Sequence, residues 1–329
     1  MKEDIDRGAQ IVIHDWVRLK PWENLLIVTC DDHMREAKAL KQCALKRCAS
    51  VDLMIVEKKG IQVGVFFDEN EQVFDGYKAI IGATNYSLVT TAATKRAIRK
   101  GSKFLSLPLS TNNGISMLAY DFMTMDTKKS KMMAQVIMKY LDSSSIIHVQ
   151  TKAGTDLHLR KQNRNAGFFN GVVKDGRGYS SASIEAYVPI EETKSEGIMV
   201  VDGSLGYIGK AKIPTELQIV QGRIVRIQET ETGRLLSDYL RQYEDSRMYV
   251  AAEFGIGLNS YSECAGNCYI EDESTYGTFH IGFGRNLALG GVWEASGHFD
   301  LVCKEPDIYV DNRQIMLQGK IIIPEPEVY

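Results

Sequence analysis

Up to residue 143 the chain alternates short, wholly apolar segments with amphipathic helical patterns, and this alternation limits the fold more than any other feature. Strands that are apolar throughout are typical of a parallel sheet with both faces covered by helices. The predicted strands are 25–30, 51–56, 77–82 and 103–107, and the predicted helices are 34–49 and 87–100. The pattern therefore predicts an α/β domain built on a parallel sheet.

From Ile146 onward the pattern changes to strands separated by glycine-containing turns. A Met-rich amphipathic helix, 128–141, precedes this change, and a helix at 232–243 interrupts the strands. The predicted strands include 146–150, 154–159, 197–202 and 217–227, with more between Tyr249 and Val310. Because 329 residues exceed one ordinary core, we expect two domains. They are a Rossmann-like α/β domain (1–143) and a β-rich α+β domain (144–329).

Composition and missing motifs exclude several classes of protein. A formal net charge of −3, with scattered Lys and Arg, argues against a nucleic-acid partner. No G-x-G-x-x-G loop follows the first predicted strand, so a dinucleotide cofactor is not expected. The charged N-terminus lacks the apolar core of a signal peptide, no apolar run reaches membrane-spanning length, and the six cysteines lack the spacing of a secreted scaffold. We therefore expect a cytoplasmic protein with reduced thiols and no membrane partner.

A polar cluster in the C-terminal part predicts a divalent metal site. His298 and Asp300 alternate on a predicted strand and so share one face. His280 lies on another predicted strand among glycines, which let a ligand approach closely. Glu253 follows an apolar run, and a buried carboxylate there needs a metal or a cation such as Arg285. We favour the metal, because Glu253 and the two histidines fall in the same β-rich region.

The remaining polar residues carry weaker signals. Cys264 and Cys268 have the wrong spacing for a zinc ribbon, and neither G-x-S-x-G nor H-E-x-x-H is present. His148 and His158 lie on predicted strands, where we expect no carboxylate in register with them. The acidic residues that we expect to be solvated in polar turns are Glu191, Glu192, Glu271, Asp272 and Glu273.

At these residues the chain resembles the aminopeptidase T family of bacterial metallopeptidases. The resemblance lies in segments 154–157, 197–203, 252–257, 271–273, 277–284, 290–291 and 298–300. It implies an α/β domain with a β-rich domain, a homodimer, and two divalent ions such as Zn, Co or Mn. The ligands that the resemblance implies are Glu185, Glu253, His280, His298 and Asp300, with Glu191 or Glu192 as alternatives to Glu185.

The same superfamily includes ring-cleaving dioxygenases of the 2,5-dihydroxypyridine type, which use one iron(II) ion held by two His and one Asp. Those residues would be His280, His298 and Asp300. The sequence also departs from the peptidases, because Leu287 stands where they carry a Tyr after the H-I-x-x-G motif, and Arg285 stands where many relatives have Asp.

Three hypotheses follow for the function. The first is a dinuclear aminopeptidase-like hydrolase that removes N-terminal residues from peptides, with Glu253 or Glu185 moving a proton. The second is the mononuclear iron dioxygenase, acting on a small molecule, and the third is a metal-free binding protein. Because Glu253 and Glu185 complete a five-ligand set, we favour the hydrolase.

Overall fold

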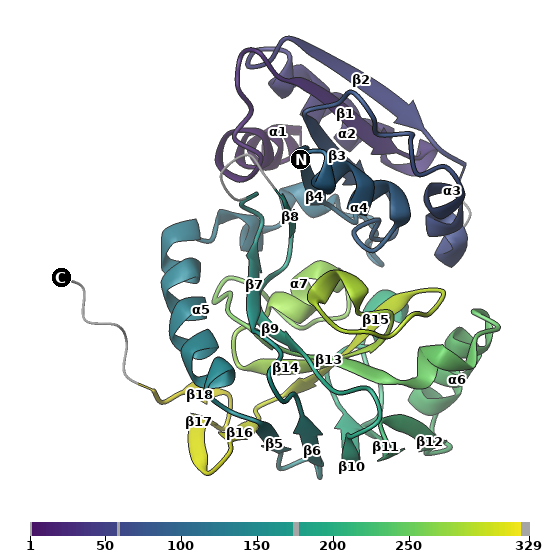
Figure 1. Cartoon of the computed structure of the whole chain (residues 1–329), viewed down its shortest axis with the longest axis vertical. Coiled ribbons are helices and arrows are strands. Elements are labelled where there is room, and N and C mark those ends of the chain that lie inside the picture. The colour runs from purple at the N-terminus through teal and green to yellow at the C-terminus, as the bar shows by residue number, and fades with distance from the viewer. Residues whose placement is uncertain (1, 58–59, 174–177, 324–329) are drawn as a thin grey trace. The chain divides into compact units, whose positions relative to one another are not determined.

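The computed structural model describes residues 2–57, 60–173 and 178–323 (Figure 1). The chain forms two compact units, of which the first comprises Met1–Thr127 with Phe169–Ser183 and the second comprises Lys128–Phe168 with Ile184–Tyr329. The first unit is thus completed by a segment that lies later in the sequence. A division into independent domains at residue 143 stays a prediction.

The first unit contains a five-stranded parallel sheet in the order β2-β1-β3-β4-β8. Its strands are β1 (Asn24–Thr29), β2 (Ser50–Ile55), β3 (Ala79–Ala83), β4 (Lys103–Ser106) and β8 (Gly178–Ser181). Its helices are α1 (Lys2–Gln10), the π-helix η1 (Ile11–Trp16), α2 (Met34–Ala44), α3 (Val63–Glu69) and α4 (Ala92–Arg99). The strands are almost wholly buried at β1, β3 and β4, which confirms the predicted α/β class with a parallel sheet.

The second unit holds an eight-stranded sheet, whose strand pairs are antiparallel, and most of a five-stranded sheet. The eight-stranded sheet has the order β12-β11-β10-β6-β5-β16-β17-β18. Its strands are β5 (Ile146–Gln150), β6 (Asp156–Arg160), β10 (Glu196–Val201), β11 (Thr215–Val220), β12 (Arg223–Ile227), β16 (Asp307–Val310), β17 (Arg313–Leu317) and β18 (Lys320–Ile321). The helices of this unit are α5 (Thr127–Asp142), α6 (Glu231–Arg241) and α7 (Tyr269–Ser274).

The prediction of one strand at 217–227 was wrong. The chain turns back at Gln221 and Gly222, so that β11 and β12 form an antiparallel hairpin. Both turn residues have positive φ angles, 47° and 76°. Two consecutive residues of this kind are typical of the tight turn that joins twisted strands.

The third sheet positions the candidate site and has the order β15-β14-β13-β9-β7. Its strands are β7 (Gly167–Asn170), β9 (Ile184–Pro189), β13 (Ala251–Gly257), β14 (Thr278–Gly284) and β15 (His298–Lys304). Alternate residues carry large apolar side chains on one face, among which Phe283 stacks on Phe299 and Phe254 packs near Phe279. The opposite face is therefore free to carry polar groups.

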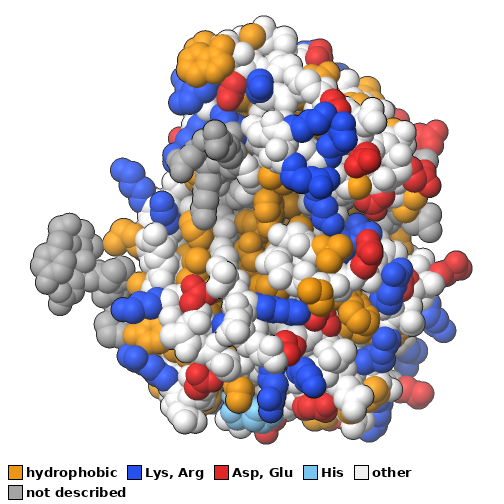
Figure 2. Space-filling model, in the orientation of Figure 1, with side chains coloured by type: hydrophobic (Ala, Val, Ile, Leu, Met, Phe, Trp, Pro, Cys, Tyr) orange, Lys and Arg blue, Asp and Glu red, His pale blue; other side chains and the backbone are white. Residues whose placement is uncertain are grey.

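Figure 2 shows basic and acidic side chains interspersed over the visible face of the molecule. Among the helices of the described ranges, none combines the length and the apolar character that crossing a bilayer requires.

Candidate metal centre

The register of the third sheet brings all five predicted ligands to one polar face. Strands β9, β13, β14 and β15 are neighbours, and alternate residues along each point to the same side. Each predicted ligand lies opposite a glycine on an adjacent strand. The pairs are Glu185 with Gly257, Glu253 with Gly282, His280 with Gly255, His298 with Gly284, and Asp300 with Gly282.

Two of these glycines provide the space that the ligands occupy. A Cβ atom at Gly255 would lie 2.0 Å from His280 Nε2. A Cβ atom at Gly282 would lie 2.6 Å from His298 Cε1 and 2.8 Å from Asp300 Oδ1. The side chains of the predicted ligands therefore lie directly over the backbone of the central strands, where any residue larger than glycine would displace them.

The ligand side chains are in direct contact. Glu185 Oε2 lies 2.7 Å from His280 Nε2, and His298 Nε2 lies 3.0 Å from Glu253 Oε2 and 3.3 Å from Asp300 Oδ1. They form two groups with the spacing of metal ligands, Glu185–Glu253–His280 and Glu253–His298–Asp300, which share Glu253. We considered a salt bridge to Arg285 as the alternative partner of Glu253. The structure instead places the imidazole of His298 beside the Glu253 carboxylate.

Burial and mutual charge shift the pKa values of these groups strongly. Burial raises the pKa of Glu253 to about 7, although His298 acts in the opposite direction. Burial disfavours a charged imidazole, but Glu185 outweighs it and raises the pKa of His280 to about 9. Burial likewise opposes ionisation of Asp300, yet His298 holds the pKa of that carboxyl well below its usual range. Buried carboxylates thus depend on positive charge from the histidines.

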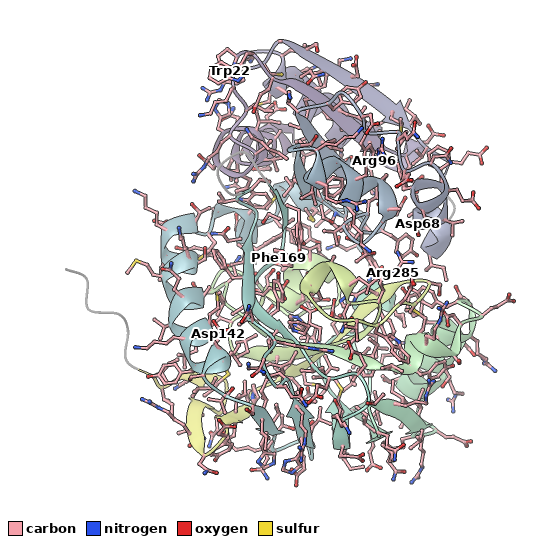
Figure 3. All side chains as sticks on the ribbon, in the orientation of Figure 1. Trp22, Asp68, Arg96, Asp142, Phe169 and Arg285 are labelled. Atoms are coloured by element: carbon pink, nitrogen blue, oxygen red, sulfur yellow. The ribbon has the colours of Figure 1, made fainter. Side chains whose placement is uncertain are left out.

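Neighbouring groups fix the orientation of two ligands. His298 Nδ1 donates to the backbone carbonyl oxygen of Arg285 at 2.8 Å, which leaves Nε2 facing the carboxylates; Figure 3 labels Arg285. The hydroxyl of Tyr269 donates to Asp300 Oδ2, so Oδ1 is the oxygen that remains toward the site. Supporting hydrogen bonds of this kind are typical of metal-binding His and Asp residues.

The acidic residues of α7 were wrongly predicted to be solvated. Glu271, Asp272 and Glu273 are 6%, 0% and 4% exposed. Asp272 accepts a hydrogen bond from the Ser204 hydroxyl at 2.6 Å, and burial raises its pKa to about 6. Burial, followed by repulsion from Glu185 and Asp300, raises the pKa of Glu273 well above its usual value. Glu273 is therefore a further carboxyl at the site that the sequence did not reveal.

Glu192 was also wrongly predicted to be solvated, and it does not join the ligand cluster. Its carboxylate pairs with Arg164 at 2.8 Å and accepts hydrogen bonds from Asn286 Nδ2 and the backbone NH of Val292. Glu191 is half-buried. Of the three glutamates considered for the same role, Glu185 is the one that contacts His280.

The polar face fits a divalent cation. Imidazole nitrogens and carboxylate oxygens together suit iron, zinc, cobalt and manganese. His280 Nδ1 and Asp300 Oδ1 are buried without a hydrogen-bond partner among the described residues. A cation at this position would satisfy buried acceptors and offset the repulsion among the carboxylates.

The expectation that His148 and His158 have no carboxylate in register was wrong as well. Asp156, which lies two residues before His158 on β6, contacts both imidazoles. Leu287, the residue in place of the peptidases' Tyr, lies half-buried in a 3₁₀ turn (Leu287–Leu289) that follows β14.

Comparisons with known proteins agree with this architecture. A family model described as NicX, 2,5-dihydroxypyridine 5,6-dioxygenase, matches residues 84–323. The 2,5-dihydroxypyridine 5,6-dioxygenase of Pseudomonas putida KT2440 is 26% identical over 215 residues, which are 61% of this chain and 60% of that protein. The aligned part thus spans less than two-thirds of that relative.

Two solved structures share the fold. The dioxygenase from P. putida KT2440 superposes with a TM-score of 0.80 at 18% identity, covering 99% of each chain. AmpT from Thermus thermophilus superposes with a TM-score of 0.67 at 12% identity, covering 98% of this chain and all of that one. This chain therefore has a fold similar to that of AmpT. Because the family model matches most of the chain and its range includes all five predicted ligands, this protein belongs to the NicX family of 2,5-dihydroxypyridine 5,6-dioxygenases.

Proposed function

We propose that the protein is a mononuclear iron(II) dioxygenase that cleaves the ring of a dihydroxylated pyridine or a closely similar aromatic compound. The observation that carries the proposal is membership of the NicX family over residues that include His280, His298 and Asp300. The hydrolase, which the sequence favoured, becomes the second candidate.

His280, His298 and Asp300 would hold the metal. Two imidazoles and one carboxylate leave coordination positions open, and ferrous iron bound in this way supplies the redox chemistry for reaction with oxygen. Tyr269 orients Asp300, and the Arg285 carbonyl orients His298. These contacts hold the ligands in place before the metal binds, so less ordering remains to be done on binding.

The glutamates have a different role in this proposal. Glu185 and Glu253 are 4% and 3% exposed and lie against the histidine ligands. A carboxylate in this position can accept the proton of a substrate hydroxyl within hydrogen-bond reach. Their burial also excludes bulk water from the polar face, which strengthens every electrostatic interaction there.

One observation favours the second candidate, a dinuclear hydrolase acting on peptide N-termini. The two ligand groups share Glu253, as expected if one carboxylate bridged two ions such as Zn, Co or Mn. In that case Glu185 and His280 would hold one ion, and His298 and Asp300 the other. Assembly as a homodimer and a cytoplasmic location stay predictions under both candidates.

Metal content decides between the candidates. The protein would be purified without chelator under anaerobic conditions and analysed for all transition metals, beside His298→Ala and the matched control His14→Ala, which changes an exposed histidine. We expect about one iron per chain in wild type and control, little in His298→Ala, and oxygen uptake with 2,5-dihydroxypyridine. About two ions per chain with turnover of aminoacyl substrates would instead establish the hydrolase. No metal, even after reconstitution, would refute both.

A further inference from the structure

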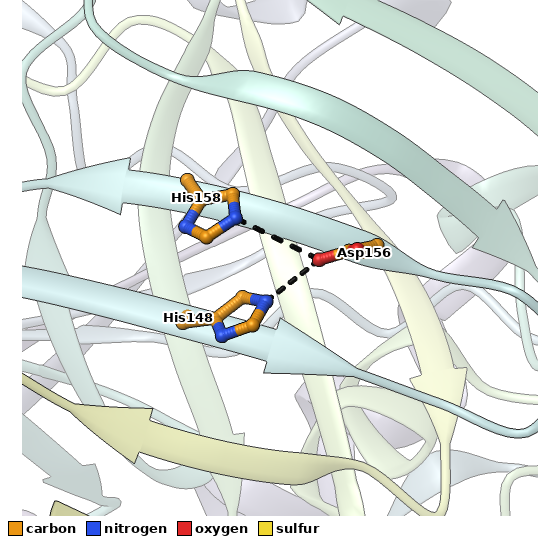
Figure 4. A group of neighbouring side chains, drawn as sticks. All are labelled: His148, Asp156 and His158. Atoms are coloured by element: carbon orange, nitrogen blue, oxygen red, sulfur yellow. Dashed lines mark hydrogen bonds and ion pairs between the residues drawn. The ribbon is translucent and has the colours of Figure 1, made fainter. Parts of the chain in front are cut away.

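A second group of metal-binding residue types lies on the eight-stranded sheet, away from the sheet that carries the candidate centre. Strands β5 and β6 pair in antiparallel register, with His148 directly opposite His158. Asp156 lies two residues before His158 on β6. Residues two apart on a strand, and residues directly opposite across a pair, share a face. The three side chains therefore meet on one side of the sheet (Figure 4).

The contacts within this group are close. Asp156 Oδ1 lies 2.6 Å from His148 Nε2 and 3.7 Å from His158 Nε2. The two imidazole rings are stacked, with centroids 4.0 Å apart and planes 8° from parallel. One ligand atom from each residue lies within 4.8 Å of the other two. Both Nε2 atoms thus point toward the same carboxylate oxygen.

The group is open to solvent. The side chains of His148, Asp156 and His158 are 25%, 57% and 57% exposed. Histidine surface is visible in Figure 2 at the bottom of the view, the end at which Figure 1 labels β5 and β6. An ion from solution could therefore reach these ligands without any movement of the backbone.

We propose that His148, Asp156 and His158 form a second, surface site for a divalent transition metal of the zinc, copper and nickel class. Two imidazoles and one carboxylate are three of the four ligands of a tetrahedral zinc site, and water would take the fourth position. Ligand atoms about 2.1 Å from one ion lie at most about 4.2 Å apart. The separations of 2.6 Å and 3.7 Å from Asp156 Oδ1 to the two Nε2 atoms lie within this limit.

The chemistry of the ligands sets the expected selectivity. Nitrogen-rich sites bind copper, nickel and zinc more tightly than ferrous iron. Zinc and copper are therefore the ions with which binding at the surface site is best tested. The alternative is that His148 and Asp156 form only a hydrogen-bonded pair, on which His158 stacks. That alternative predicts no uptake of metal.

The test is a zinc titration of the full-length, iron-loaded protein by calorimetry. Three variants would be compared with wild type: the double variant His148→Ala/His158→Ala, Asp156→Asn, and His14→Ala as a matched exposed histidine outside the group. We expect about one zinc per chain in wild type and in His14→Ala, none in the double variant, and at least tenfold weaker binding in Asp156→Asn. Thermal melts would establish that each variant is folded.

Copper(II) provides a second readout that does not depend on activity. Electron paramagnetic resonance of His298→Ala, in which the buried centre has lost one of its two imidazoles, should show two nitrogen ligands. This signal should disappear when His148→Ala/His158→Ala is added to the same protein. Zinc binding that is absent from wild type, or unchanged in the double variant, would overturn the proposal. Because His298→Ala separates the two sites, failure here leaves the proposed function standing.

Discussion

Substituting Gly282 by Ala should weaken metal binding about ten- to a hundredfold while leaving the protein folded. The backbone of Gly282 is not in the left-handed region, so its conformation is open to Ala. The added Cβ would lie 2.6 Å from His298 Cε1, 2.8 Å from Asp300 Oδ1 and 2.8 Å from Glu253 Cβ. Ordinary van der Waals contacts of a Cβ atom begin at 3.4 Å, so the His298 ring must move away by about 0.8 Å. The clash therefore falls on two of the proposed ligands and on the glutamate beside them.

The size of the effect follows from how little error a metal site tolerates. Ligand distances are held to within about 0.2 Å, so a displacement of about 0.8 Å is about four times the tolerance. We expect affinity for the metal to fall ten- to a hundredfold, or about 1.4–2.7 kcal/mol. Overpacking of the sheet should cost about 1–3 kcal/mol of unfolding free energy. Since the free energy of unfolding of a typical domain is about 5–15 kcal/mol, the variant should remain folded.

The assay is metal content after equilibrium dialysis, paired with a thermal melt. Gly64→Ala is the matched control, because that glycine lies in helix α3 and its Cβ would meet only Thr91 Cγ2, at an ordinary 3.6 Å. The control should keep full metal affinity and gain up to about 1 kcal/mol of stability. Wild-type affinity in a folded Gly282→Ala protein would refute the assignment of this face as the metal centre.

Two further predictions concern the residues around the site. Tyr269→Phe removes the hydrogen bond to Asp300 and should weaken metal binding about tenfold. The control Tyr261→Phe changes an exposed tyrosine and should leave metal binding unchanged. Equal metal contents of the two variants in a competition dialysis would contradict this prediction. Arg164→Met leaves the buried Glu192 carboxylate without its cation and should cost about 3 kcal/mol, measured by denaturant unfolding. Burial acts to raise the pKa of Glu192, but the hydrogen bonds from Arg164, the Val292 NH and Asn286 together outweigh it and hold the pKa below its usual 4.5. The stabilisation is therefore present above pH 4.5 and is lost as pH falls through the folded value. In Arg164→Met this loss of stability on acidification should become smaller, and an unchanged pH profile would count against the pair.

The candidate ligands could be predicted because strand periodicity is a local property of the sequence. His298 and Asp300 share a face by their spacing alone, and the glycines around His280 indicate by themselves that another group approaches closely. The parallel sheet was predictable for the same reason, since β1, β3 and β4 are short, apolar and separated by helical patterns. The family resemblance supplied Glu185, which the local pattern did not single out.

What could not be predicted depends on contacts between distant segments. Helix α7 is six residues long, which is too short for a helical period to show which side chains are buried. Glu273 was therefore predicted to be solvated. Strand β8 joins the first sheet although it follows β5 and β6 of the second unit in sequence. The approach of Asp156 to His148 required the pairing of β5 with β6, for which the short connection between them was the available signal.

The order of the ligand strands along the chain has a consequence for biosynthesis. Glu185 is made first, then Glu253 and His280, and His298 with Asp300 last of the five. A nascent chain that has not yet reached β15 lacks two of the proposed ligands, so we expect an ion to be captured only after β15 has joined the sheet. Glu185, Glu253, His280 and Asp300 are buried in the folded protein, so we expect a bound ion to exchange slowly. The metal found in the mature protein should therefore report which ions were available in the cell at the moment of folding.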